Sequence, residues 1–130
     1  MDQKEIQIKV KLINDYIEAY NSFDIELMLD LLDEEIEFKN ISHGEITDST
    51  KGKVEFSLIA EQSKALFSKR KQKIENITFL KDGASVDIVF SATMAISTPD
   101  GLKAGQEISF KGSSSFTFKD NKISKIHDIS

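Results

Sequence analysis

The first third of the chain has hydrophobic residues at helical spacing. Apolar or aromatic residues recur at steps of three and four: Ile6, Val10, Ile13, Ile17 and Tyr20. This spacing predicts an amphipathic helix over about residues 3–20, with Tyr16 at the edge of its apolar stripe. Polar residues at 21–24 then interrupt the pattern and offer capping side chains. The apolar residues between Leu27 and Leu32 predict a short second helix.

In the middle of the chain the spacing of apolar residues changes from helical to alternating and then back to helical. Ile36, Phe38 and Asn40 alternate with charged residues, which predicts a brief strand with these three on one side. The polar stretch 41–52, which contains His43, predicts a loop long enough to form a mouth or lid. From Lys53 to about Lys71 the apolar residues return to helical spacing and cover more than one face. We therefore expect a third helix that lies across a sheet.

In the second half of the chain apolar and polar residues alternate, which predicts an antiparallel meander of four strands. The strands are expected at residues 74–80, 84–97, about 104–119 and from 122 onward. Turn residues separate them at Asp82-Gly83, Pro99-Asp100-Gly101 and Asp120-Asn121. The order of helix, helix, strand, helix and four strands predicts one α+β domain over residues 1–130. We expect the helices on one face of the sheet and a cavity between the two layers.

The amino-acid composition and the net charge exclude several kinds of functional site and binding partner. The 130 residues include no cysteine, which excludes disulfides, thiolate metal sites and cysteine nucleophiles, and favours a cytoplasmic location. With two histidines we expect no metal site, and with no phosphate-binding glycine loop we expect no cofactor. A net charge of -5 argues against nucleic acid as a partner, and no apolar run is long enough for a membrane span. The basic cluster of residues 69–73 (Lys69, Arg70, Lys71 and Lys73) is interpreted as the solvated end of the third helix.

Three polar residues fall on or near apolar faces of the predicted strands. Asn40 follows Phe38 at a spacing of two, and Ser114 lies between Gly112 and Phe116 in the same way. Such groups either contact a ligand or bond only to the backbone or an ordered water. The facing of Asp128 is open, because alternation from Ile123 turns His127 inward whereas alternation from Ile126 turns Asp128 inward. A bulge between the two isoleucines would reconcile both patterns.

Two segments resemble a known superfamily. Residues 15–40, DYIEAYNSFDIELMLDLLDEEIEFKN, resemble the entry of nuclear transport factor 2-like proteins. Residues 110–130, FKGSSSFTFKDNKISKIHDIS, resemble the closing strands of its SnoaL-like and ketosteroid isomerase-like branches, with Asn121 in place of the usual glycine. The resemblance implies a cystatin-like fold, a cone-shaped curved antiparallel sheet wrapped by three N-terminal helices. It also favours Asp128 inward and His127 outward.

The resemblance also implies roles for single residues. Tyr16 matches the oxyanion-holding tyrosine of ketosteroid isomerases. Asn40 stands where their proton-shuttling aspartate lies, and Ser114 where their second oxyanion donor lies, so classical isomerase activity is not expected. SnoaL-like cyclases carry an acid/base aspartate in the closing strands, for which Asp128 is the nearest match.

These observations predict a homodimeric protein that binds a small hydrophobic molecule in an apolar cone, with its catalytic status undecided. The alternative is an isomerase, dehydratase or cyclase that uses Asp128 as acid/base, with Tyr16 or Asn40 stabilising a developing enolate oxygen. A third possibility is an assembly role, in which the cavity is vestigial and the outer face pairs two subunits through Val89, Ser91, Thr93 and Ala95. The predicted ligand-binding residues are Tyr20, Phe38, Asn40, Phe67, Phe90, Met94, Ser114 and Phe116.

Overall fold

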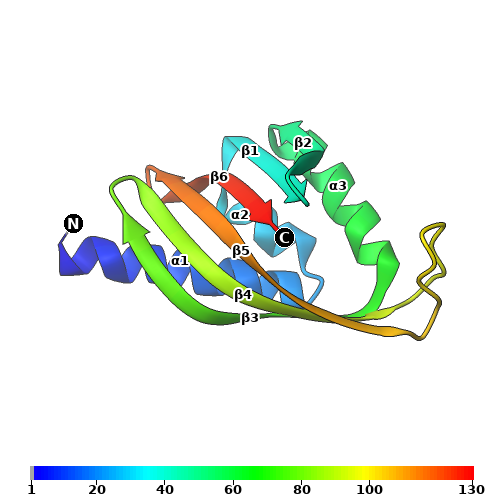
Figure 1. Cartoon of the computed structure of the whole chain (residues 1–130). Helices are drawn as coiled ribbons and strands as arrows, with labels where there is room; N and C mark the ends of the chain where they lie inside the picture. The colour runs from blue at the N-terminus through cyan, green and yellow to red at the C-terminus, as the bar shows by residue number, and fades with distance from the viewer. Residues whose placement is uncertain (1) are drawn as a thin grey trace.

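Helices cover one side of a long, curved sheet in the computed structural model, which describes residues 2–130 (Figure 1). The helices are α1 (Gln3–Asn21), α2 (Ile25–Asp30) and α3 (Lys53–Leu66). The strands are β1 (Leu32–Ser42), β2 (Glu45–Lys51), β3 (Phe67–Leu80), β4 (Gly83–Met94), β5 (Glu107–Lys119) and β6 (Lys122–Ile129). The predicted α+β class with a curved sheet is confirmed.

Capping side chains fix where the first two helices begin. The Asp2 side chain accepts a hydrogen bond from the Glu5 amide at 2.8 Å, and the Asp24 side chain accepts one from the Leu27 amide at 3.1 Å. Between these helices Phe23 adopts a left-handed conformation with φ 59°, which is unusual for a bulky residue. The chain therefore turns sharply at Phe23, and α2 packs against α1.

The sheet has the order β2-β1-β6-β5-β4-β3. Its neighbours pair antiparallel except for β1 and β6, which run parallel, so the expectation of a fully antiparallel sheet is wrong at this one junction. The parallel pair arises because the last strand returns to lie between β5 and β1. It places residues from both ends of the chain side by side, with Asn40 beside Asp128.

The predicted loop at residues 41–52 is instead mostly β2. His43 and Gly44 both have positive φ (51° and 80°), which is the requirement of a tight two-residue hairpin turn between β1 and β2. The third helix also ends at Leu66 rather than near Lys71, and β3 begins at Phe67 rather than Ile74. Residues 69–74 alternate strictly between inward and outward side chains, which suits a strand and not a helix.

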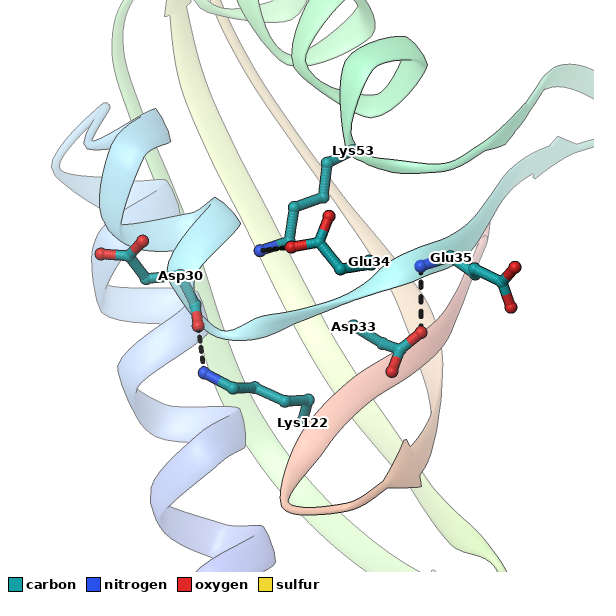
Figure 2. A network of polar contacts seen from close by, with 6 residues as sticks. All are labelled: Asp30, Asp33, Glu34, Glu35, Lys53 and Lys122. Atoms are coloured by element: carbon teal, nitrogen blue, oxygen red, sulfur yellow. Dashed lines mark hydrogen bonds and ion pairs between the residues drawn. The ribbon is translucent and has the colours of Figure 1, made fainter.

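Polar contacts fasten the α2–β1 connection to neighbouring elements (Figure 2). Lys122 at the start of β6 donates to the Asp30 carbonyl oxygen at 2.6 Å, and Lys53 at the start of α3 lies 3.4 Å from Glu34 of β1. The Asp33 side chain accepts a hydrogen bond from the Glu35 amide at 3.0 Å. These contacts join the start of β1 to the starts of β6 and α3.

One end of the cone is filled by side chains. Ile13 and Ile17 of α1 pack over Val86, Phe116, Ile123 and Ile126 of the sheet, each at most 5% exposed. The Phe116 ring meets the Tyr16 ring edge-to-face at 5.9 Å. This filled end is the main hydrophobic core, and it leaves the opposite end of the cone for a cavity.

Candidate functional site

A cavity of about 730 Å³ lies between the helices and the inner face of the sheet. Aromatic residues make up much of its wall, in contact with one another through edge-to-face or tilted rings. The ring pairs are Phe38–Phe56 at 5.6 Å, Phe67–Phe90 at 5.5 Å and Phe90–Phe110 at 5.2 Å. A volume of this size and an apolar wall with a few polar groups are typical of small-molecule sites.

Asp128 presents its carboxyl group to this cavity from β6. The Ser114 hydroxyl on the adjacent strand β5 donates to an Asp128 carboxylate oxygen at 2.6 Å, and the two residues are direct cross-strand partners. Burial raises the pKa of Asp128 to about 6, and the Ser114 hydrogen bond and the nearby His127 limit that rise. At neutral pH the carboxyl group can therefore both accept and return a proton.

A bulge on β6 sets the facing of Asp128. Thr117 pairs with Lys125 and the next residue, Phe118, pairs with Ile123, which leaves Ser124 without a partner in the ladder. Ile123 and Ile126 are therefore both fully buried, and Asp128 shares the inward side with Ile126. His127 points to the other side of the sheet, where its Nε2 lies 2.9 Å from the Glu37 carboxylate. The alternative with His127 inward is wrong.

Tyr16 and Tyr20 line the cavity from successive turns of α1. Burial raises the pKa of the Tyr16 hydroxyl well above its usual value, and the negative charge of Asp128 raises it further. Burial also raises the pKa of Tyr20. Both phenols are neutral at physiological pH, so each can donate a hydrogen bond to an oxygen atom in the cavity.

Asn40 lines the cavity but its amide is engaged by the neighbouring strand. Its Nδ2 donates to the Thr47 hydroxyl at 2.8 Å, and that hydroxyl lies 3.3 Å from the Asn40 carbonyl oxygen. Asn40 therefore faces the cavity with a side chain already held by β2. An amide can orient a ligand but takes up no proton at neutral pH.

Eight of the ten predicted site residues line the cavity: Tyr16, Tyr20, Phe38, Asn40, Phe67, Phe90, Ser114 and Asp128. Phe116 does not, because at its level the cone is filled and its ring packs under Tyr16. Met94 does not either. It is 3% exposed at the end of β4, where its backbone bonds to Gln106 and Gly105 of the following connection. A strand residue that faces inward can thus lie at the filled end of the cone and not at the end that contains the cavity.

Arg70 is one of the cavity residues that the sequence interpretation missed. The basic cluster is not a helix end, since it lies on β3 with Lys69, Lys71 and Lys73 exposed and Arg70 only 5% exposed. The inward facing of Arg70 could have been predicted from alternation, because Arg70 lies at a spacing of two from Gln72 and of four from the apolar Ile74. Phe56 and Phe110 also line the cavity and were not predicted as site residues.

The family is decided by residues 13–126, which match the profile of the SnoaL-like domain. The chain belongs to this family. A comparison with curated proteins finds no match.

Solved structures show the same fold for this SnoaL-like protein. A candidate polyketide cyclase from Xanthomonas campestris pv. campestris is 19% identical, with 95% of this chain and 90% of that chain covered and a TM-score of 0.80. A cystatin-fold protein from Novosphingobium aromaticivorans is 14% identical, with 94% and 97% covered and a TM-score of 0.76. A protein with a ketosteroid isomerase-like fold from Catenulispora acidiphila, in complex with trimethylamine, is 10% identical, with 90% and 82% covered and a TM-score of 0.73.

Two further properties bear on the class of site. Within residues 2–130 no group of three or more histidine and acidic side chains is arranged to hold a metal ion. None of the helices described combines the length and apolarity that a membrane crossing requires.

Proposed function

We propose that this SnoaL-like protein binds a small hydrophobic molecule in the cavity and that Asp128 transfers a proton to or from it. The observation that carries the proposal is the inward Asp128 carboxyl group, which borders an open apolar cavity and has a pKa of about 6. A general base with a pKa near the working pH is largely ionised and still returns its proton readily. The reaction class that fits is isomerisation, dehydration or cyclisation.

The neighbouring side chains support such a proton transfer. Ser114 holds the Asp128 carboxylate in one orientation through the 2.6 Å hydrogen bond. The neutral Tyr16 phenol is a hydrogen-bond donor in a water-poor wall, where a donor aimed at a developing oxyanion stabilises it strongly. Asn40 supplies a second polar contact from β1.

Hydrogen–deuterium exchange into a small carbon acid tests this role. We suggest 2-tetralone in D₂O, followed by proton NMR of its activated CH₂ group next to the carbonyl. The protein should accelerate this exchange, and Asp128→Asn should reduce the acceleration by about 100-fold or more. The rate should rise with pH through about 6, as Asp128 loses its proton.

His127→Asn is the matched control for that experiment. It changes the adjacent residue on β6, whose side chain faces Glu37 on the other side of the sheet. It should keep most of the acceleration and alter the rate only through its small effect on the Asp128 pKa. Exchange that persists in Asp128→Asn, with a circular dichroism spectrum like that of the wild type, would remove Asp128 from the proposed role.

Binding without catalysis is the second candidate function. The observation that favours it is Asn40, whose amide is tied to Thr47 and stands at the position of the isomerase base. Under this function 2-tetralone would raise the melting temperature of the protein while its exchange rate stayed at the buffer value. The same sample therefore separates the two candidates.

We also propose that the protein is a cytoplasmic homodimer. Val89, Ser91 and Thr93 of β4 alternate with buried residues and so lie on the side of the sheet away from the helices, where a second copy could pack. Sedimentation at micromolar concentration tests the pairing, and a monomer would contradict it. Fractionation of the source cells tests the location.

A further inference from the structure

Arg70 is a buried cation at the cavity wall without an acidic partner. Its side chain is 5% exposed and lines the cavity from β3. No carboxylate in residues 2–130 lies within ion-pair distance of its guanidinium. Asp100, which lines the same cavity, accepts a hydrogen bond from Thr98 instead. Charged side chains are seldom buried without an opposite charge, so the lack of one at Arg70 needs a physical reason.

The surrounding residues hold this guanidinium in place without neutralising it. Its Nε donates to the Tyr20 carbonyl oxygen at 2.8 Å, and its Nη1 lies 3.4 Å from the Ser63 hydroxyl. The Tyr20 ring lies 3.7 Å from the guanidinium carbon and the Phe23 ring 4.4 Å from it. The unusual left-handed conformation of Phe23 occurs at this contact. These contacts orient the planar group, and cation–π attraction offsets part of its lost hydration.

One end of the guanidinium remains without a partner. Nη2 is buried and makes no hydrogen bond in the structure, and Nη1 has two N–H groups but a single long contact. Arginine stays charged at neutral pH even though burial lowers the pKa of Arg70. The guanidinium therefore has a full positive charge and unsatisfied N–H groups within an apolar wall. Its chemical complement is a planar anion.

We propose that Arg70 binds the carboxylate of the small molecule that occupies the cavity, and so determines which end of that molecule faces Asp128. This inference rests on the proposed function only in that the cavity must bind a ligand. The ligand class is an apolar ring or chain that bears one carboxylate. Two oxygens of a carboxylate match the fork of a guanidinium, which makes this the strongest common pairing of the arginine side chain.

The placement of the two charges supports an orienting role. Asp128 on β6 and Arg70 on β3 line one cavity together with Tyr16 and Tyr20, and the Arg70 guanidinium lies against the Tyr20 ring. Both charges therefore act on the same bound molecule. A carboxylate is attracted to Arg70 and repelled by ionised Asp128, so an anionic molecule enters in one direction. The group that exchanges a proton is then the one remote from the carboxylate.

A pair of probes of nearly equal shape tests the anchor. We suggest 2-naphthoate and its neutral analogue 2-naphthamide, titrated by isothermal calorimetry at pH 7.5. The wild-type protein should bind naphthoate at least about tenfold more tightly than naphthamide, the ratio expected for one charge-assisted pair. In Arg70→Met this preference should disappear while the naphthamide affinity stays within about twofold of wild type.

Lys71→Met is the matched control. It removes the same charge from the next residue of the same strand, but this side chain is exposed on the outer face. It should leave the preference for naphthoate unchanged. Arg70→Lys keeps the charge without the fork and should retain a smaller preference, which provides a second variant if Arg70→Met does not fold.

The outcomes separate this inference from the proposed function. Equal wild-type affinity for the two probes overturns the Arg70 anchor and leaves the cavity as a binding site. The anchor is also overturned if a folded Arg70→Met loses affinity for both probes equally. It is likewise overturned if Lys71→Met loses the preference for naphthoate as Arg70→Met does. Failure of both probes to bind the wild type contradicts the binding cavity and the anchor together. Asp128→Asn, which tests the proton transfer, should keep or increase the preference for naphthoate.

Discussion

Asp128 and Arg70 both line the cavity, and the fold treats these two groups differently. Asp128 receives a hydrogen bond from Ser114 at 2.6 Å, and its pKa of about 6 lets it lose its charge under mildly acidic conditions. Arg70 keeps its charge at neutral pH, leaves Nη2 without a partner and is supported by aromatic rings and a backbone carbonyl. The charge of Asp128 can thus be switched by protonation, whereas the charge of Arg70 is permanent.

The difference indicates separate tasks. A group that gains and loses a proton near neutral pH suits acid–base chemistry, whereas a permanent charge that is rigidly held suits binding. Both groups reduce the stability of the empty protein, because each is partly desolvated without full compensation. Residues that cost stability in this way are typical of functional sites.

The largest predicted effect is a dependence of stability on pH that originates at Asp128. Its pKa is raised from 3.8 in a model peptide to about 6, so between these values the folded state binds more protons than the unfolded state. The contribution of Asp128 to stability is therefore greatest at low pH and is lost as pH rises through about 6. Asp128→Asn should be more stable than wild type by about 2–3 kcal/mol at pH 7.5 and by little at pH 4, as measured by urea unfolding.

Asp87→Asn is the control for this comparison. Asp87 lies on the exposed face of β4, so its variant should follow the wild-type dependence on pH within about 0.5 kcal/mol. A free energy of unfolding for Asp128→Asn that stays parallel to wild type from pH 4 to 7.5 would contradict the raised pKa.

The next prediction separates the effect of the Ser114 hydrogen bond on the Asp128 pKa from the effect of burial. Ser114→Ala removes a donor to the half-buried Asp128 carboxylate, so the pKa of Asp128 should rise above about 6. The variant should lose about 1–2 kcal/mol of stability at pH 7.5, because the carboxylate is then ionised without its partner. At pH 4 the loss should be smaller. Carbon-13 NMR of the carboxyl group would measure the pKa.

Ser115→Ala serves as the comparison variant, since residue 115 faces the opposite side of β5 and pairs with His127. An unchanged Asp128 pKa in Ser114→Ala would show that the 2.6 Å contact does not restrain the carboxyl group.

Much of the fold was predictable because its helices and most strands have clear periods. The stripe of α1 and the alternation of β4 and β5 each give one face to the core, which fixes the element and its orientation. The hairpin of β1 and β2 was not predicted, because Thr47, Ser49 and Thr50 are polar and β2 covers little core. The parallel pairing of β1 with β6 joins residues about ninety positions apart, which no local pattern specifies.

The site was predictable where a polar residue interrupts an apolar face. Asn40 and Ser114 were identified in this way. The inward facing of Asp128 was favoured only by the family resemblance, and the bulge at Ser124 in the structure sets it. Arg70 was missed because its exposed neighbours Lys69 and Lys71 make the segment resemble a solvated surface. Met94 and Phe116 were misplaced because alternation predicts which side a residue faces but not which level of the cone is hollow.

The smallest predicted effect comes from a substitution at Asn21, which changes the surroundings of Arg70 but not its guanidinium. Asn21 at the end of α1 makes two hydrogen bonds to the backbone of Gln72 on the edge strand β3, with Oδ1 accepting at 2.7 Å and Nδ2 donating at 3.1 Å. These bonds join the end of α1, which carries the Tyr20 ring and carbonyl, to the strand that carries Arg70.

Asn21→Ala should therefore cost about 1 kcal/mol in urea unfolding and reduce the preference for naphthoate by a few-fold, because the guanidinium loses part of its fixed geometry. Asn21→Asp keeps the acceptor and loses the donor, so its effect on both quantities should be intermediate. Ser22→Ala removes only an exposed bond to the Glu18 carbonyl within the same helix end and should leave the probe preference unchanged. If Asn21→Ala lowers stability but leaves the preference intact, Arg70 is oriented by Tyr20 and Phe23 alone, and the contact between α1 and β3 is structural.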